Sequence, residues 1–154
     1  MSKKKVLMAA SSGGHLEEVL ALYPLKDRYE TVLITEKTGY NVNFWQDKVY
    51  YMPQVNRREL KSLLWYVGVI FKTWKILRHE KPDAVLSAGA MIAFPTMFLA
   101  KLMGIKTIFV ECMFNVDSAT LTGKLCYRFV DLFIVQWEEM LKIYPKAVFG
   151  GRIF

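Results

Sequence analysis

The residues best suited to chemistry lie in a short segment near the start of the chain, SSGGH at residues 11–15. It follows an apolar run of strand length and precedes residues with helical spacing, so we expect it to join a strand to a helix. Glycine lets a ligand approach the backbone, and the N–H groups that open a helix carry partial positive charge. Ser12, Gly13 and Gly14 are therefore candidate anion-binding residues, and His15 is a candidate acid–base residue or phosphate donor.

The same segment also has a purely structural interpretation. It is not the GxGxxG fingerprint of dinucleotide-binding folds, and it lacks the Lys and Ser/Thr of a P-loop. A tight strand-to-helix turn requires glycine for conformational reasons alone. From the residues alone, the anion-binding and the structural interpretations both stay open.

Two later positions follow predicted strands and are weaker candidates. Gly89, in the sequence SAGA, either admits a ligand or only permits a turn. Glu111 ends an otherwise apolar strand, which is mildly favourable to a catalytic role at the carboxyl end of a sheet. Asp117 and Ser118 are expected to cap the following helix rather than to bind a ligand. The sequence contains neither an HExxH motif nor an evident Ser/His/Asp constellation.

Apolar runs of strand length alternate with longer segments of helical period along the whole chain. We expect strands at residues 5–10, 30–35, 48–52, 83–87, 106–110 and 131–135. We expect helices at residues 15–25, about 59–80, 95–103 (closed by Gly104) and 119–130. This alternation predicts an α/β fold, a Rossmann-like parallel sheet with helices on both faces. Such sheets bind ligands at the carboxyl ends of their strands, so the loops at 11–15, 87–91 and 111–118 are expected to share a cleft.

Composition narrows the class of partner. A chain of 154 residues fits one domain, residues 1–154, and its net charge of +7 suggests an anionic partner such as nucleic acid, anionic lipid or a phosphorylated substrate. No nucleic-acid-binding motif is present, so we expect no nucleic acid partner. Cys112 and Cys126 are too few for a disulfide scaffold and do not fit a four-ligand zinc site, which indicates a reducing cytosol. We also expect no metal and no cofactor.

The segment at 57–81 combines an apolar stripe with basic flanks. The stripe has helical spacing and consists of Leu60, Leu63, Leu64, Val67, Ile70, Phe71, Trp74 and Leu77. Aromatic residues beside cations suit a helix that lies in an anionic membrane interface. The residues expected to face that membrane are Trp65, Lys72, Trp74, Lys75 and Arg78. A buried core helix with solvated ends is the alternative, and both stay open.

Three stretches carry a resemblance to a known family: SSGGH with Glu17 and Glu18 behind it, KPDAVLSAGAMIAFP, and the C-terminal FIVQW…YPKAVFGGRI. Over residues 5–154 the chain resembles the membrane-anchoring, acceptor-side subunit of two-chain UDP-sugar glycosyltransferases. Relatives include the endoplasmic-reticulum subunit of the chitobiosyl-forming N-acetylglucosaminyltransferase and bacterial capsule and exopolysaccharide proteins. The resemblance implies a fold equivalent to the N-terminal half of a GT-B glycosyltransferase, with a separate catalytic chain that binds most of the UDP-sugar.

The resemblance also implies roles for individual residues. Gly13, Gly14 and His15 would face the diphosphate of a polyprenyl-diphosphate-linked sugar, with His15 near the reacting hydroxyl. Other residues of the same cleft would be Gly89, Glu111 and Asn115, and those that dock the catalytic chain would be Gly151, Arg152, Ile153 and Phe154. Because the chain enters its first strand at once, attachment is expected to be peripheral, at the cytoplasmic face of the cell membrane. We expect the chain to be inactive or weak alone in inverting sugar transfer.

A free-standing nucleotide- or nucleotide-sugar-binding enzyme that uses the Gly-Gly-His loop is the alternative function. The two hypotheses differ in one observable property. The free-standing enzyme would bind a UDP-sugar by itself, whereas the subunit would bind it only together with its partner.

Overall fold

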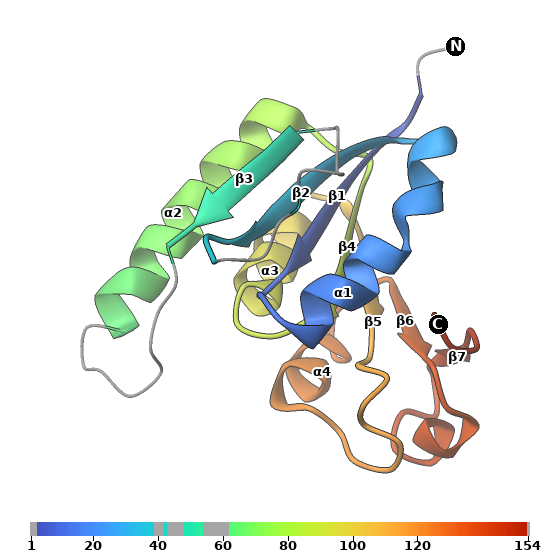
Figure 1. Cartoon of the computed structure of the whole chain (residues 1–154). Coiled ribbons are helices and arrows are strands. Elements are labelled where there is room, and N and C mark those ends of the chain that lie inside the picture. Colours follow the sequence, from blue (N-terminus) through green and yellow to red (C-terminus); the bar gives the residue numbers. More distant parts are fainter. Residues whose placement is uncertain (1–2, 39–41, 43–47, 54–61, 154) are drawn as a thin grey trace.

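One parallel sheet forms the centre of the molecule (Figure 1). The computed structural model describes residues 3–38, 42, 48–53 and 62–153. Within them the strand order is β3-β2-β1-β4-β5-β6-β7, and every neighbouring pair is parallel. The strands are β1 (Lys5–Ala10), β2 (Glu30–Glu36), β3 (Lys48–Met52), β4 (Ala84–Gly89), β5 (Lys106–Val110), β6 (Leu132–Val135) and β7 (Val148–Phe149). The predicted Rossmann-like fold class is confirmed.

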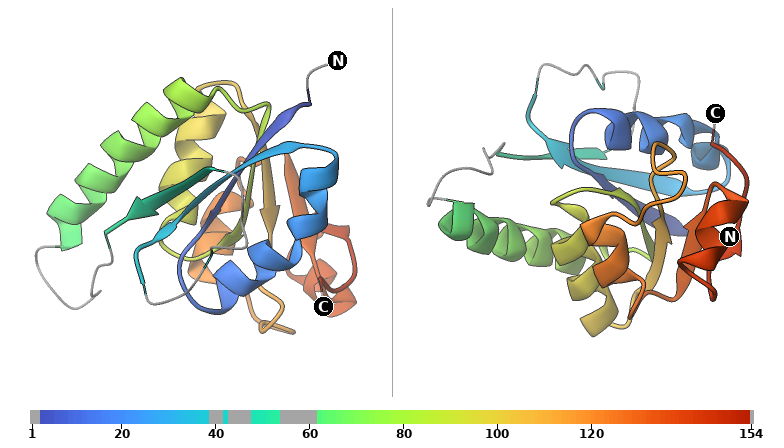
Figure 2. Two further views of the ribbon diagram at one scale, coloured as in Figure 1. Left: turned by 45° about the horizontal axis from the view of Figure 1, so that its top comes forward. Right: turned by 90° about the horizontal axis from the view of Figure 1, so that it is seen from below.

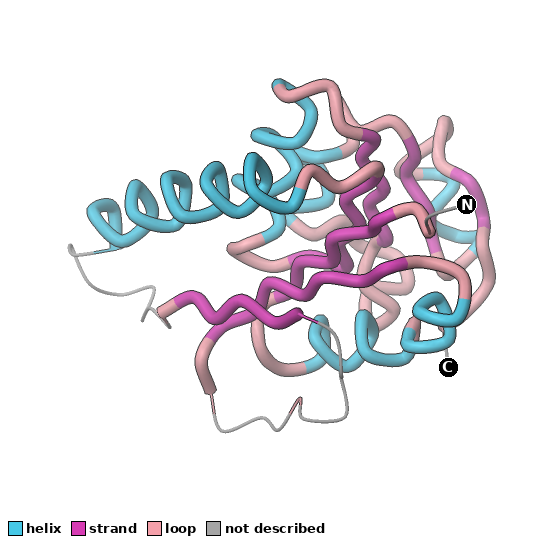
Figure 3. Tube along the Cα trace, turned by 90° about the horizontal axis from the view of Figure 1, so that it is seen from above, coloured by secondary structure: helices cyan, strands magenta, loops and turns pink. Residues whose placement is uncertain are grey.

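Helices cover both faces of this sheet (Figures 2 and 3). The helices are α1 (Gly14–Ala21), α2 (Ser62–Glu80), α3 (Ala93–Leu102) and α4 (Leu121–Cys126), with 3-10 turns η1 (Tyr23–Asp27) and η2 (Glu138–Lys142). α1 lies on one face, whereas α2, α3 and α4 lie side by side on the other. Residues of β1 alternate between the two cores, because successive side chains of a strand point to opposite faces. Leu7 and Ala9 pack with α2 and α3, and Met8 and Ala10 pack with α1.

Several predicted helix boundaries were wrong, each for a local reason. The helix expected at 15–25 ends at Ala21, and the chain continues as η1, in which Pro24 lies at the start. The helix expected at 119–130 is shorter, and its cap is Thr120 rather than Asp117 or Ser118, because the Thr120 hydroxyl accepts a hydrogen bond from the Gly123 N–H. Residues 59–61 of the long predicted helix lie outside the described residues, and 62–80 are helical as expected. Gly104 follows α3 with φ +73°, as predicted for a left-handed cap.

A buried carboxylate joins three elements at the amino edge of the sheet. Glu80, at the end of α2, accepts hydrogen bonds from Lys5 Nζ of β1 (3.1 Å) and from Lys48 Nζ of β3 (2.7 Å). The Tyr50 hydroxyl of β3 donates to the same carboxylate. Burial alone would raise the pKa of Glu80, but these three donors together lower it to about 2. This network therefore ties α2 to β1 and β3 at the edge of the sheet opposite the carboxyl ends of the strands.

Candidate functional site

The centre of the candidate site is the imidazole of His15, in the first turn of α1. Its Nδ1 lies 3.0 Å from the backbone oxygen of Ala88 in β4. A carbonyl oxygen only accepts hydrogen bonds, so Nδ1 carries the proton and Nε2 is the basic nitrogen of the neutral ring. Gly89 makes this approach possible, because a Cβ there would lie 3.2 Å from two atoms of the ring, and because its φ of +121° favours glycine. The structure thus brings two predicted site residues, His15 and Gly89, into contact.

His15 forms part of the wall of a pocket of about 520 Å³ at the carboxyl edge. The pocket is lined by His15, Tyr66, Ala90, Met91, Phe94, Thr120, Leu121, Thr122 and Leu125. These residues come from α1, α2, the loop after β4, α3 and α4. The lining is largely apolar, with the imidazole and the hydroxyls of the tyrosine and the threonines as its polar side-chain groups. Such a pocket suits a ligand that has both an apolar portion and a polar group.

The loop at residues 11–15 has an unusual backbone conformation, and its Ser12 side chain already has a hydrogen-bond partner within the protein. Gly13 has φ +94° and ψ −149°, a conformation essentially limited to glycine. The ring of Phe114 lies over Gly14, where a Cβ would be 2.7 Å from the ring edge. The backbone N–H and the hydroxyl of Ser12 both donate to Glu36, at 3.2 and 3.0 Å. A phosphate at this loop would therefore be bound by the N–H groups that open α1, because Ser12 is engaged by a carboxylate.

Glu111 is buried in a network that holds α4 in place. Its Oε1 accepts hydrogen bonds from the Cys112 N–H (3.0 Å) and the Thr120 hydroxyl (2.8 Å), and its Oε2 accepts one from the Tyr144 hydroxyl (2.7 Å). The side chain is 1% exposed and does not line the pocket. This geometry supports a structural role for Glu111, and its catalytic role stays a prediction. Asn115, also predicted for the cleft, is half-buried, and its Nδ2 donates to the Ser118 backbone oxygen at 3.1 Å.

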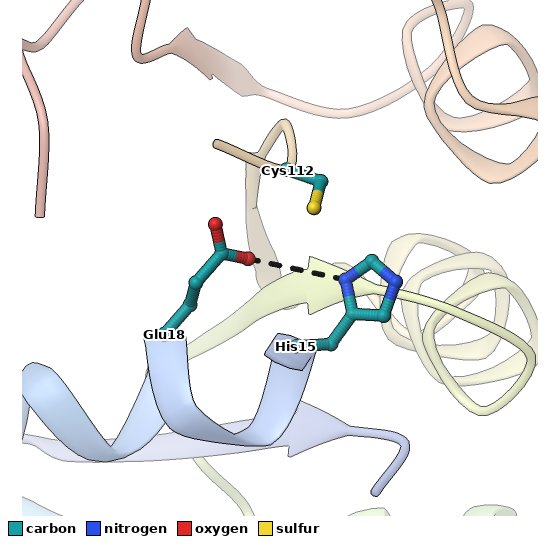
Figure 4. Close-up of side chains that lie close together, drawn as sticks. All are labelled: His15, Glu18 and Cys112. Atoms are coloured by element: carbon teal, nitrogen blue, oxygen red, sulfur yellow. Dashed lines mark ion pairs between the residues drawn. The ribbon is translucent and has the colours of Figure 1, made fainter. Parts of the chain in front are cut away.

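A second buried carboxylate, Glu18, lies next to His15 (Figure 4). Glu18 accepts hydrogen bonds from the Met113 N–H (2.6 Å) and from Gln136 Nε2 (3.1 Å). Burial raises the pKa of Glu18, and these hydrogen bonds offset part of that effect. Burial likewise raises the pKa of the neighbouring Cys112 thiol to about 11, so the sulfur is protonated at neutral pH.

His15, Glu18 and Cys112 lie close enough to suggest a metal site, since one ligand atom from each falls within 4.8 Å of the others. Two features oppose that use. Nδ1 of His15 is protonated and donates to the Ala88 oxygen, so this nitrogen is not available to a metal. The Cys112 thiol would have to lose its proton in a buried setting before it could bind a metal. The three side chains fit a hydrogen-bonded network better than a set of metal ligands.

One face of α2 is buried and the other carries exposed apolar side chains. Val69, Thr73, Ile76 and Leu77 are buried, so the core-helix interpretation holds for that face only. Neighbouring helices extend the outer face, which we call the apolar face: Val67, Phe71 and Trp74 of α2, Phe98 and Leu102 of α3, and Leu121 and Leu125 of α4, all exposed.

The predicted membrane-facing cations are exposed and lie on the same helix. Lys72, Lys75 and Arg78 are all exposed, and the Arg78 guanidinium lies 5.1 Å from the Trp74 ring. The side chain of Trp65 lies outside the described residues. Among the described helices, none combines the length and apolar character needed to cross a bilayer.

The C-terminal segment is tied to the network around Glu18. Gln136 follows β6, and its Oε1 accepts a hydrogen bond from the Ile153 N–H (3.0 Å), while its Nε2 donates to Glu18. The Arg152 guanidinium lies 5.3 Å from the Trp137 ring. A groove of about 370 Å³ is lined in part by Gln136, Trp137, Gly151 and Arg152. Phe154, the last predicted docking residue, lies outside the described residues.

Sequence reasoning missed several residues of this site. Tyr66, whose hydroxyl donates to the Met91 oxygen, lines the pocket from α2, and Gln136 joins distant segments. Glu18 alone had a local signal, because it lies three residues after His15 and so shares its side of the helix. The other two depend on contacts that no local pattern shows.

The family model and the curated relatives that match this chain indicate the same protein family. The family model described as "Oligosaccharide biosynthesis protein Alg14 like" matches residues 48–153. The human UDP-N-acetylglucosamine transferase subunit ALG14 is 28% identical over 96% of this chain and 82% of that protein. The Schizosaccharomyces pombe subunit is 36% identical over 60% of this chain and 44% of that protein.

A longer curated transferase and two solved structures match this chain only over part of their length. The UDP-N-acetylglucosamine–N-acetylmuramyl-(pentapeptide) pyrophosphoryl-undecaprenol N-acetylglucosamine transferase of Syntrophus aciditrophicus is 27% identical over 99% of this chain, but over 45% of that protein. The crystal structure of Acinetobacter baumannii MurG superimposes with a TM-score of 0.74 at 22% identity, over 88% of this chain and 42% of that chain. The UDP-N-acetylglucosamine 2-epimerase from Rickettsia bellii gives 0.75 at 16% identity, over 98% and 45%. The chain thus spans less than half the length of these three proteins and shares the fold of one part of the two solved structures.

Proposed function

Because the chain belongs to the Alg14-like family of oligosaccharide biosynthesis proteins, we propose that it is the acceptor-side subunit of a UDP-sugar-dependent glycosyltransferase. Its substrate would be a lipid-linked saccharide, in the synthesis of an oligosaccharide or a surface polysaccharide. Residues 1–154 would form one domain, and a separate chain would bind the UDP-sugar. The names of the relatives make UDP-N-acetylglucosamine the first donor to test.

The observation that carries this proposal is the position of His15 in the wall of a largely apolar pocket, beside the N-terminus of α1. A polyprenyl-diphosphate-linked sugar has the matching chemistry. Its diphosphate would bind the N–H groups that open α1, and its first isoprene units would contact Tyr66, Phe94 and Leu125. The acceptor hydroxyl would then lie near the imidazole.

The reaction would use His15 as the proton acceptor. The hydroxyl oxygen of the acceptor forms a bond to the anomeric carbon of the donor sugar as the bond from that carbon to the UDP oxygen breaks. UDP leaves with the bonding electrons, and the hydroxyl proton goes to Nε2 of His15. Attack from the side opposite UDP inverts the anomeric centre. The chain that binds UDP would complete the cleft, so this chain alone would be inactive or weak.

The apolar face would attach the subunit to the membrane that holds its lipid substrate. Its side chains would enter the interface while Lys72, Lys75 and Arg78 contact anionic headgroups. Since the pocket opens among the same helices, a lipid would pass from the membrane to His15 without crossing water. The attachment would be peripheral, on the cytoplasmic side.

Titration of the isolated chain tests the proposal directly. Geranyl diphosphate, a soluble polyprenyl diphosphate, is added to the labelled chain and followed by NMR, and UDP-N-acetylglucosamine is added to a second sample. We expect shifts at His15, Gly14 and Leu125 with the first ligand, and none with the second. Micromolar binding of UDP-N-acetylglucosamine without a partner would instead support a free-standing nucleotide-sugar enzyme.

A further inference from the structure

A buried carboxylate lies behind the proposed proton acceptor. Glu18 is fully buried, one helical turn after His15, and its Oε2 lies 3.9 Å from His15 Nδ1 (Figure 4). Met113 and Gln136 hold the other oxygen, Oε1, from two different loops. Among the described residues Oε2 has no nitrogen or oxygen donor within hydrogen-bond distance, and the Cys112 thiol is the other polar group beside this carboxylate. The carboxylate is therefore fixed in place with one oxygen available to the ring.

We propose that Glu18 is a positioning residue for His15, and that its carboxylate stabilises the imidazolium that forms when Nε2 takes the acceptor's proton. This inference rests on the proposed function, in which His15 receives that proton. The Ala88 oxygen sets the orientation and tautomer of the ring, and Glu18 supplies the negative charge. The proton stays on Nε2, and Glu18 does not exchange one with the substrate.

The surroundings of the pair favour a strong interaction. Glu18 has no exposed surface and His15 is only partly exposed, so water screens their charges weakly. Within the part of the chain that the structure describes, the other titratable groups that face the pair are Glu111 and Cys112, directly after β5, and Tyr66 across the pocket. Burial, and to a smaller extent the charge of Glu111, raise the pKa of Glu18, and an imidazolium beside the carboxylate would counteract this.

Because the chain has few histidines, the titration of His15 can be followed separately by NMR. The chain has two histidines, and the second, His79, is exposed on α2 and serves as an internal reference. In the Glu18→Gln variant, NMR titration of the imidazole resonances should show the midpoint of His15 falling by about one pH unit. The midpoint of His79 should not move. Glu17→Gln, the exposed neighbour on the same helix, is the matched control and should leave both unchanged.

A reciprocal variant keeps the test valid if Glu18→Gln does not fold. In His15→Gln, the titration of the Glu18 carboxyl, followed by its ¹³C resonance, should move to higher pH, because the neighbouring cation is lost. Thermal unfolding of each variant separates these shifts from a loss of structure. An unmoved His15 midpoint in Glu18→Gln, or an unmoved Glu18 midpoint in His15→Gln, overturns the proposal.

Activity with the catalytic chain distinguishes this inference from the proposed function. In the two-chain enzyme, Glu18→Gln should lower kcat about tenfold and leave KM for the lipid acceptor unchanged, because Glu18 does not touch it. If His15→Gln retains full turnover, the proposed role of His15 is wrong, whatever the titrations show. If His15→Gln is inactive but Glu18→Gln is fully active, the role of Glu18 alone is overturned.

Discussion

Gly123 shows how closely single residues are constrained behind the site. A Cβ at this position would overlap the Glu111 carboxylate and would lie 2.8 Å from the Thr120 hydroxyl. Both groups are fixed by hydrogen bonds to other elements, so neither can move aside easily. The glycine is thus required by the packing of α4 against β5 rather than by a special backbone conformation.

We expect Gly123→Ala to destabilise the fold by about 2–3 kcal/mol, because the methyl group forces a buried network apart. Gly68→Ala is the matched control: Gly68 lies in the exposed part of α2 with open space around its Cα. Alanine there should stabilise the fold by about 0.5–1 kcal/mol, since it loses less backbone entropy. Urea unfolding followed by circular dichroism measures both. If Gly123→Ala changed the free energy of unfolding by the same amount as Gly68→Ala, the space between Gly123 and the Glu111 carboxylate would be larger than the structure shows.

At the scale of elements, Glu80 should make stability depend on pH. Its folded pKa of about 2 is below its ordinary value of 4.5, so its ion pairs stabilise the fold fully above pH 4.5. That stabilisation is lost as the pH falls from 4.5 toward 2. We expect a loss of roughly 2 kcal/mol, allowing for screening at the half-exposed Lys48.

Urea unfolding between pH 7 and pH 3 tests this expectation against a Glu80→Gln variant. The variant should be less stable at pH 7 and should lose less stability on acidification than the natural chain. Asp131, whose pKa its partner Lys101 and hydrogen bonds from Thr107 also lower to about 2, contributes equally to both proteins. Parallel pH curves for the two proteins would contradict the prediction.

The apolar face makes a second prediction at this scale. Changing both Phe71 and Trp74 to Ser should weaken binding to anionic liposomes at least tenfold, because two large exposed side chains no longer enter the interface. Folding stability should stay within about 0.5 kcal/mol, since neither side chain is part of the core. Flotation with liposomes that contain anionic lipid is the measurement.

Two controls separate apolar from electrostatic attachment. Tyr23, exposed at the start of η1 directly after α1, is changed to Ser and should leave binding intact. Changing Lys72, Lys75 and Arg78 to Glu should abolish the preference for anionic lipid. If the double Ser variant floats as well as the natural chain, the apolar face does not contact the membrane.

The elements could be predicted to different degrees. Strands such as 48–52 and 106–110 were predicted with the observed bounds, because buried parallel strands form short apolar runs between turn signals. The bounds of α4 were wrong because its cap is Thr120, whose hydroxyl accepts from the Gly123 N–H and donates to Glu111, nine residues earlier in the chain. In the candidate site, the glycines and His15 could be proposed from local spacing alone. The donors to Glu18 lie 95 and 118 residues away in the chain, at Met113 and Gln136, and only the folded sheet reveals them.

At the scale of the whole molecule, Gln136 joins the proposed acceptor site to the C-terminal segment. Its Nε2 donates a hydrogen bond to Glu18, and its Oε1 accepts one from the backbone N–H of Ile153. If the C-terminal segment docks the catalytic chain, docking would order the residues that hold Glu18 beside His15. Such coupling would explain how the separate halves of a cleft become active only together.

The C-terminal segment therefore carries the last prediction. Arg152→Ala removes the guanidinium that lies over Trp137, and we expect it to weaken binding of the catalytic chain about tenfold, as for an interface hot spot. Lys106→Ala is the matched control, because it removes the same charge from an exposed residue at the amino edge of the sheet. Calorimetric titration with the purified catalytic chain measures both affinities. Equal affinities for the two variants would place the docking surface elsewhere, and the link through Gln136 would then have no role in assembly.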